Sequence, residues 1–357
     1  MVKTSTTAGR ILVTGGMGFI GSNFVRLLLA ERPGWEMWNL DLLTYAANPE
    51  NLADVAPAAE AAGRYRFVRG DVADPERMAE LFRAARFDAV AHFAAESHVD
   101  RSIASAAPFV RTNVVGTQVL LDAAREAGVR RFVHVSTDEV YGDLEADEPA
   151  FTEATPIRPS SPYSASKAGS DHLALAYHRT HGMDVVVTRC SNNYGPYQFP
   201  EKLIPLMIVN ALEGHPLPVY GRGENVRDWI HVEDHCRGVL AALEGGRGGE
   251  VYNFGGASER RNLEVVRRIA RAVGASEELI RFVTDRPGHD RRYAIDFAKA
   301  RAELGWTPSR TFDEGLEATV RWYLDNRGWW QRVRDGAYRT SAEMIASWGE
   351  TGVEAAR

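Results

Sequence analysis

A tyrosine and a lysine stand four residues apart at Tyr163 and Lys167, directly after the pair Ser161-Pro162. Proline is accepted in the first turn of a helix, where its missing N–H breaks no hydrogen bond, so we predict that a helix begins at Ser161. Residues four apart share one face of a helix. An ammonium on that face stabilises a phenolate and lowers the pKa of the tyrosine, at about 1.4 kcal/mol per pKa unit. The pair therefore predicts a tyrosine base, although the pattern is short and also occurs as an ordinary surface pair.

Two adjacent carboxylic acids, Asp138 and Glu139, follow the apolar run from Phe132 to Val135 and the hydroxyl residue Thr137. Eliminating water from a keto sugar needs one group that takes a proton and one that gives a proton, so one acid must be charged and the other neutral. Adjacent residues leaving a strand point in different directions, and burial raises the pKa of the acid that stays neutral. Asp-Glu is more often part of a solvated loop, but its place at the end of a strand favours an acid–base pair.

Glycines follow the first apolar run at G-x-G-x-x-G spacing, through Gly16, Gly18 and Gly21, and also at the looser spacing Gly15, Gly18, Gly21. Such glycines permit a tight turn and bring backbone amides to a pyrophosphate at a helix N-terminus. The glycines alone would also fit a plain strand-to-helix turn. About 20 residues further on, Asp41 is placed to bind a ribose 2′-hydroxyl. Its charge would repel a 2′-phosphate and no arginine directly follows it, so we predict NAD rather than NADP.

These groups must be positioned by a sheet, because apolar β-branched runs recur and alternate with helical patterns such as that from Gly116 to Glu126. The fold class that this predicts is α/β, a doubly wound Rossmann-type parallel sheet with a smaller, discontinuous substrate-binding domain. We expect an NAD-binding domain over 1–190, with returning segments near 229–262, and a second domain over 191–228 and 263–350. The predicted strands are 11–13, 37–40, 65–68, 89–93, 132–135 and 185–187.

Bulk composition is that of an ordinary globular protein, with 45% hydrophobic and 25% charged residues. The net charge of −6 and the lack of a basic stripe argue against nucleic acid as a partner. Two cysteines, no secretory leader and no membrane-length apolar run lead us to expect a cytoplasmic protein without membrane contact.

Two further patterns invite a functional interpretation. The pair His231 and His235 has H-x-x-x-H spacing but lacks the H-E-x-x-H order and a distant third ligand, so we expect no metal and a helix start capped by acids. Trp329-Trp330 follows an amphipathic helix and is more typical of packing than of a stacking platform.

Together these motifs, from about Arg10 to the region of Trp322, resemble the extended short-chain dehydrogenase/reductase family. In that family the tyrosine and lysine that match Tyr163 and Lys167 are catalytic, and many members act on nucleotide sugars. The adjacent Asp138 and Glu139 resemble the dTDP-glucose 4,6-dehydratase branch, whereas epimerases and decarboxylases of the family usually have small or hydroxyl residues there. This resemblance implies catalytic roles for Thr137, Asp138, Glu139, Tyr163 and Lys167, with Asp138 the acid at the 6-hydroxyl and Glu139 the base at C5.

The resemblance also implies two sets of binding residues. The cofactor set, for NAD, comprises Gly15, Gly18, Phe19, Ile20, Gly21, Asp41, Leu42, Leu43, Thr44, Asp71, Val72, Ala94, Ala95, Glu96, Ser97, Thr112, Tyr163, Lys167 and Asn193. The substrate set comprises His98, Thr137, Asn192, Lys202, Leu203, Pro218, Val219, Tyr220, Arg227, Asn262, Asp285, Arg286 and His289.

The activity implied is NAD-dependent dehydration of a nucleotide-activated glucose, with dTDP-glucose as the first choice, to a 4-keto-6-deoxy sugar. A nucleotide-sugar epimerase or decarboxylase on the same fold, or a non-catalytic NAD-binding regulator, remain alternatives. Helices over about 102–127 and 161–181 would form a homodimer contact in this family.

Overall fold

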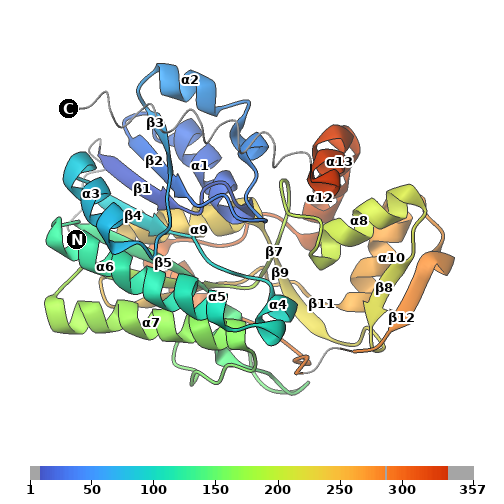
Figure 1. The fold of residues 1–357 in the computed structure, drawn as a ribbon. Coiled ribbons are helices and arrows are strands. Elements are labelled where there is room, and N and C mark those ends of the chain that lie inside the picture. The colour runs from blue at the N-terminus through green and yellow to red at the C-terminus, as the bar shows by residue number, and fades with distance from the viewer. Residues whose placement is uncertain (1–8, 286–287, 337–357) are drawn as a thin grey trace.

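The computed structural model describes residues 9–285 and 288–336, and its centre is a parallel sheet of seven strands in the order β10-β6-β5-β4-β1-β2-β3 (Figure 1). All six strands expected from the sequence are present, and β10 is added at one edge. After β3 at the far edge the chain returns to place β4 beside β1, so the strand order reverses there. Ligands of such sheets bind at the carboxyl ends of the strands near this reversal. The strands are β1 Arg10–Thr14, β2 Glu36–Asp41, β3 Tyr65–Arg69, β4 Ala89–His92, β5 Arg131–Thr137, β6 Val185–Cys190 and β10 Val251–Phe254.

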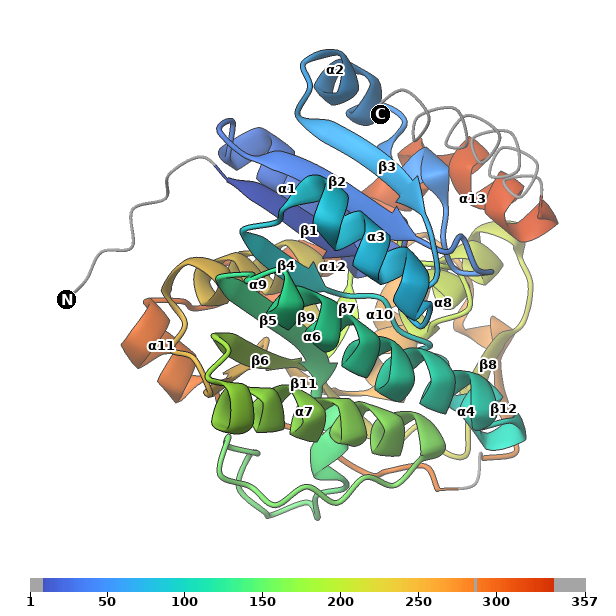
Figure 2. The same cartoon turned by 60° about the vertical axis from the view of Figure 1, so that its left-hand side comes forward.

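Helices cover both faces of this sheet, as the doubly wound prediction requires. One layer holds α1 Phe19–Glu31, α9 Val232–Gly245 and α11 Ala298–Leu304. The other holds α3 Pro75–Ala85, α6 Gly116–Glu126 and α7 Pro162–His181, which lie side by side in Figure 2. The short α2, Ala56–Ala61, packs beside β3 at the edge.

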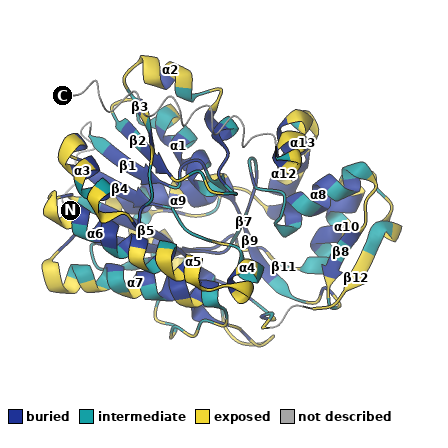
Figure 3. Cartoon of the chain, viewed as in Figure 1, coloured by how far each residue is buried: buried dark blue, intermediate teal, exposed yellow. Residues whose placement is uncertain are grey.

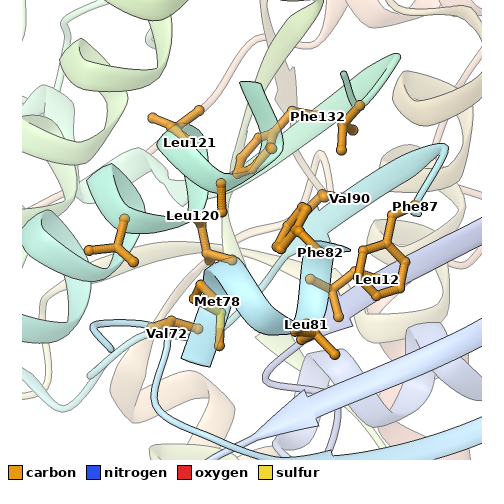
Figure 4. Close-up of a cluster of buried hydrophobic side chains, with 14 of the residues drawn as sticks. Leu12, Val72, Met78, Leu81, Phe82, Phe87, Val90, Leu120, Leu121 and Phe132 are labelled. Atoms are coloured by element: carbon orange, nitrogen blue, oxygen red, sulfur yellow. The ribbon is translucent and has the colours of Figure 1, made fainter. Parts of the chain in front are cut away.

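The alternation of side chains along the strands divides the core between these layers. Ile11 and Val13 of β1 point into the cluster beneath α1 and α9, whereas Leu12 joins the cluster beneath α3 and α6. Figure 4 shows this second cluster, in which Phe82 and Leu120 approach the sheet. Burial on both faces explains why the strands read as continuous apolar runs.

The expectation of one helix over about 102–127 is wrong. The structure has α4 Val99–Ala104, α5 Ala107–Phe109, a π-helical stretch η2 Val110–Val115 and then α6. Ser105 is extended, with φ −155° and ψ 115°, which ends α4. Pro108 lies in the first turn of the next helix, the position where proline is tolerated, so the helix restarts there.

A second, smaller group of elements lies beside the carboxyl ends of the sheet, at the right of Figure 1. It is built around a core that includes Ile208, Val266 and Trp330. Trp329 and Trp330 are buried in this core, as their packing interpretation expects. Its elements are β7 Asn192–Tyr194, α8 Leu203–Glu213, β8 Leu217–Tyr220, β9 Val226–His231, β11 Glu259–Arg261, α10 Asn262–Ala272, β12 Ile280–Val283, α12 Phe312–Asp325 and α13 Arg327–Asp335. Three short 3₁₀ segments complete the chain: η1 Pro49–Leu52, η3 Asp138–Tyr141 and η4 Glu277–Leu279.

Burial follows this layering, with a dark sheet and exposed outer helix faces in Figure 3. Within the described ranges, no helix combines the length and the apolar character needed to cross a membrane.

Candidate active site

The two predicted acids lie in a 3₁₀ turn, η3, directly after β5. Thr137 caps this turn, because its Oγ1 accepts a hydrogen bond of 3.2 Å from the Glu139 N–H. The same hydroxyl donates to Asp138 Oδ1 at 3.4 Å. Asp138 is buried and Glu139 is half-buried, so the turn gives neighbouring carboxyls different surroundings.

The carboxyl of Asp138 is suited to be neutral. Burial raises its pKa well above the ordinary value, and the charges of Glu139 and Asp228 act in the same direction. Arg227 and the hydrogen bond from Thr137 oppose this shift without reversing it. Asp138 Oδ2 has no hydrogen-bond partner among the described residues. A buried polar atom without a partner is costly, so this atom is available to a bound ligand.

Tyr163 and Lys167 lie on the buried face of α7, as the four-residue spacing predicts. Ser161 caps this helix in a reciprocal pair with Ser164, and Pro162 is its first residue. The lowered pKa expected for Tyr163 from Lys167 is not found, because burial raises this pKa well above its ordinary value, and Glu139 and Asp138 add to the rise, against a hydrogen bond to Thr137. Because Glu139, Asp138 and Thr137 all shift the pKa of Tyr163, the acid pair and the tyrosine share one site.

The ammonium of Lys167 points toward the sheet rather than into solvent. Its Nζ donates to the Val135 carbonyl at 2.8 Å. Burial lowers the pKa of Lys167 to about 8, against the carboxylate of Asp171. The group therefore still carries its charge at neutral pH.

The glycine turn fits a dinucleotide phosphate. Gly15 has φ +72°, a left-handed conformation that glycine adopts without strain. A Cβ on Gly21 would lie 2.1 Å from the Gly15 carbonyl oxygen, so α1 can pack against the turn only with glycine there. Gly18 begins α1 without a side-chain cap. Such a helix N-terminus offers its backbone amides to an anion.

The remaining residues of the predicted cofactor set come together at the carboxyl ends of the strands. Asp41 ends β2, and its two oxygens accept hydrogen bonds from the N–H groups of Met17 at 2.9 Å and Leu43 at 2.8 Å. It thus shapes the loop after β2 as well as facing the glycine turn. Asp71 after β3 is in an ion pair with Arg111, at 2.6 Å. Gly15 and Phe19–Gly21 follow β1, Leu42–Thr44 follow β2, Val72 follows β3, Ala94–Ser97 follow β4, Asn193 follows β6, and Thr112 lies in η2.

Several predicted substrate residues join the two parts of the chain across the site. Lys202, at the start of α8 with Leu203, donates to the Ser97 carbonyl at 3.0 Å. His98 Nε2 lies 3.7 Å from Glu201 Oε2. Asn192 is the first residue of β7, and its Oδ1 is buried without a hydrogen-bond partner in the described part of the chain.

Arg227 is a second buried cation of the site, 5% exposed. Its guanidinium lies 4.3 Å from the ring centroid of Tyr293 and donates to the Asp290 carbonyl at 2.9 Å. The charge of Arg227 also lowers the pKa of Asp138, which places the two groups near each other.

The residues of the predicted wall around a base differ in burial. Val219 is 2% exposed and packs in the core of the second group of elements, because side chains alternate along β8. Tyr220 lies on the opposite face and is 42% exposed. Its ring centroid is 6.0 Å from that of His289, which pairs with Asp285 at 2.6 Å. Pro218 shares the face of Tyr220, Asn262 begins α10, and Arg286 lies outside the described residues.

The structure also brings in residues that the sequence patterns missed. Asp228 and Tyr293 reach the acid pair from β9 and from the segment before α11. Asn113 of η2 binds the backbone of Glu96 and donates to Ser166 on α7 at 2.8 Å. Asp228 stands beside the selected Arg227 and Asn113 beside the selected Thr112, which is the signal that the sequence offered for them.

The histidine pair has another use than metal binding. His231 caps α9, whose first turn contains Glu233 and Asp234, and His235 Nδ1 lies 2.9 Å from Asn193 Oδ1. No group of three His, Cys, Asp or Glu side chains in the described ranges is arranged to hold a metal ion.

Comparisons with known proteins show similarity over most of the chain. The family model described as GDP-mannose 4,6 dehydratase matches residues 12–319. A dTDP-glucose 4,6-dehydratase from Streptomyces niveus is 54% identical over 91% of this chain and 96% of its own length. The NAD-bound crystal structure of the dTDP-glucose 4,6-dehydratase of Streptomyces venezuelae has a TM-score of 0.86, with 55% identity over 91% of this chain and 99% of that one. A UDP-glucose 4-epimerase from Thermus thermophilus, also with NAD, has a TM-score of 0.81 and 33% identity, over 89% of this chain and 99% of that one.

Proposed function

Because this chain belongs to the GDP-mannose 4,6-dehydratase family, and within it to the dTDP-glucose 4,6-dehydratases, we propose that it converts dTDP-glucose to the 4-keto-6-deoxy sugar. It is then a lyase that uses NAD, and the cofactor is restored in every turnover. This agrees with the activity expected from the sequence.

The observation that carries the proposal is the pair of unlike carboxyls at the end of β5, beside Tyr163. Asp138 is buried with a raised pKa, and Glu139 next to it is half-buried. A group that is neutral at working pH can donate a proton, and an ionised one can accept it. C4 epimerisation has no use for such a pair, whereas eliminating water between C5 and C6 requires it.

Each residue then has one role in the reaction. Tyr163 takes the proton of the C4 hydroxyl, with Lys167 stabilising the phenolate and Thr137 donating a hydrogen bond. Glu139 removes the C5 proton, which the C4 ketone makes acidic. Asp138 gives its proton to the departing 6-hydroxyl, so that water leaves and a C5–C6 double bond forms. The reaction ends when a proton returns to C5.

NAD, when bound, supplies the oxidant for C4 and the reductant that later saturates C6. The residues that would hold it are the glycine turn with the first residues of α1, Asp41 at the ribose, and the loops after β3, β4 and β6. Lys167 and Asn193 complete this set on the nicotinamide side. The open N-terminus of α1 and the close packing of Gly21 support this assignment.

We assign the nucleotide part of the substrate to the second group of elements. Arg227 is a buried cation that can pair with a phosphate, and Lys202 at the start of α8 brings a second positive charge. Tyr220 provides an exposed ring surface beside which a base can lie, with the largely buried His289 ring next to it. We accordingly propose the division expected from the sequence. The NAD-binding domain covers 1–190 with returning segments near 229–262, and the nucleotide-sugar domain covers 191–228 and 263–350.

The test is an isotope experiment. With deuterium at C4 of dTDP-glucose, the product should carry that label at C6 and a solvent-derived proton at C5. Label found again at C4, with the 6-hydroxyl intact, would assign the chain to the epimerases. A variant with Glu139→Gln or Tyr163→Phe should turn over at least ~10²-fold more slowly, as expected when a general base is lost. Unchanged function in both variants would instead support a non-catalytic regulator.

We further propose that the protein is a cytoplasmic homodimer. Apolar side chains are exposed along α4 and η2, with Ile103 at 44%, Val110 at 47% and Val115 at 40%. Contiguous exposed apolar residues favour a protein contact. Both cysteines are free, which suits a reducing compartment. Sedimentation of Val110→Glu should give a monomer where the parent chain gives a dimer, and cell fractionation tests the location.

A further inference from the structure

The catalytic groups sit on two separate elements that must keep a fixed distance. Tyr163 and Lys167 belong to α7, whereas Asp138 and Glu139 belong to η3. One turn beyond Lys167 on α7 is Asp171, and the last residue of η3 is Tyr141. Both side chains are buried, and neither faces the solvent-accessible part of the site.

A buried arginine connects these two residues. Arg189 of β6 donates from Nε to Asp171 Oδ2 at 2.8 Å and from Nη1 to the Tyr141 hydroxyl at 2.9 Å. Its side chain is 4% exposed and that of Asp171 is fully buried. The planar guanidinium has donors at fixed angles, so the two bonds define the relative position of α7 and η3.

Tyr141 is itself held from two further sides. Its hydroxyl donates to Asn253 Oδ1 on β10 at 2.9 Å, and its ring stacks on Phe151 with centroids 5.0 Å apart. In the sheet, Arg189 is the register partner of Ser136 on one side and of Asn253 on the other. The arginine therefore lies one strand away from the residues that lead into the acid pair.

Stability alone does not explain this arrangement. Removing two charges from water is expensive, and a buried ion pair can often be replaced by apolar side chains without loss of stability. The pair is nevertheless ionised, because burial is outweighed by Arg189 and His134, which lower the pKa of Asp171 to about 2. A costly and rigid connection between two catalytic elements indicates a positioning role.

We propose that Asp171, Arg189 and Tyr141 form a buried strut that holds the Asp138–Glu139 turn at a set distance from Tyr163 and Lys167. The inference rests on the proposed dehydration. The three are positioning residues, since none of them reaches the sugar. Oxidation at C4 uses Tyr163 and Lys167 of α7 with Thr137 at the end of β5, whereas elimination also requires the carboxyls of η3 to act on adjacent carbons of the same sugar. Loosening the strut at η3 should therefore slow elimination more than oxidation.

The variant that tests this is Tyr141→Phe, which removes one hydroxyl and keeps the ring stacked on Phe151. Replacing Arg189 would leave a buried carboxylate unpaired and endanger folding. The matched control is Tyr252→Phe on the same strand as Asn253, because the Tyr252 hydroxyl is also buried and donates to Glu303 at 2.8 Å, away from the site.

The reaction with dTDP-glucose is quenched at short times, and mass spectrometry separates the 4-keto sugar that keeps its 6-hydroxyl from the 6-deoxy product. In Tyr141→Phe the ratio of the first to the second should rise at least ~10-fold over the parent enzyme, because small misplacements of catalytic groups cost up to about 10²-fold in rate. Amide hydrogen exchange over residues 138–142 should also be faster in Tyr141→Phe and unchanged in Tyr252→Phe.

Two results would overturn the strut. One is an unchanged ratio with unchanged amide exchange in Tyr141→Phe. The other is an equal loss of both steps in Tyr141→Phe and Tyr252→Phe, which a general loss of stability explains. Neither is confused with failure of the proposed function, because that failure appears in the parent enzyme as the absence of any 6-deoxy product.

Discussion

Lys167 carries a buried charge that the proposed reaction needs, so its removal should give an inactive but more stable protein. Burial lowers the pKa of its ammonium from an ordinary 10.5 to about 8. At about 1.4 kcal/mol per pKa unit, the difference means that the charged form is destabilised on folding by about 3 kcal/mol. Lys167→Met removes this cost and also the hydrogen bond from the charged Nζ to the Val135 carbonyl, worth about 1.5–3 kcal/mol. We expect a net gain of up to about 2 kcal/mol in the free energy of unfolding.

The sign of the pH dependence follows from the same values. Below pH 8 the folded and unfolded chains both hold the proton, so the folded protein bears the whole cost. As the pH rises from about 8 toward 10.5, the folded chain loses its proton first and the parent protein gains stability. The advantage of Lys167→Met should therefore be full at neutral pH and vanish by the upper end of this window.

Thermal unfolding followed by circular dichroism measures the effect, on protein freed of bound nucleotide, since a ligand of the folded state alone adds stability. A gain of about 2 kcal/mol corresponds to a rise in Tm of a few degrees in a chain of this size. Lys299→Met is the control, because Lys299 pairs with Glu250 at the surface and should give no gain. The reasoning is refuted if Lys167→Met unfolds at a lower temperature than the parent at neutral pH, or if it retains full dehydratase turnover.

Three further substitutions test other parts of the site and core. Asp138→Asn should lower turnover by about 10²- to 10⁴-fold, the usual contribution of a general acid, while the 4-keto sugar with its 6-hydroxyl still forms; loss of both steps would argue against this role. Its unfolding temperature should not fall, since an amide replaces a carboxyl that is already neutral. Gly21→Ala should abolish NAD retention, measured by release of nucleotide on gel filtration, because its Cβ would lie 2.1 Å from the Gly15 oxygen. Trp330→Ala should cost about 3–5 kcal/mol in denaturant unfolding, as for other fully buried aromatic side chains, and a cost below 1 kcal/mol would show that this core has collapsed around the gap.

The strands and the ends of strands could be predicted from the sequence because their signals are local. A strand buried on both faces reads as a short apolar run, and residues at its carboxyl end reach a ligand in this fold. That is why Asp41 and Asp138 could be selected from the sequence, whereas Tyr163 was selected by its spacing from Lys167 on a helix. The helical start at Ser161 was equally local, because a cap and a proline suffice to define it.

Features that depend on distant contacts could not be predicted in this way. The break at Ser105 is set by one extended residue within an otherwise helical pattern, and Val219 was selected although alternation along β8 turns it into the core. Arg189 lies just beyond the predicted strand 185–187, and its partners Asp171 and Tyr141 are separated from it by 18 and 48 residues. Nothing in their spacing marks them as neighbours.

The same distinction applies to the chemistry of the acid pair. From the sequence, Asp138 and Glu139 are two similar carboxylic acids, and either one could be acid or base. Their difference comes first from the burial of Asp138 and then from the charge of Glu139, and β9 adds to it by placing Asp228 near Asp138, which raises the pKa of Asp138 further. Because a negative charge on Asp228 favours the protonated form of Asp138, Asp228→Asn should lower the pKa of Asp138. In a pH profile of the elimination rate, the fall in activity on the alkaline side should then begin at a lower pH than in the parent enzyme. The assignment of Asp138 as the acid is then a property of the assembled fold, although the residue itself was visible in the sequence.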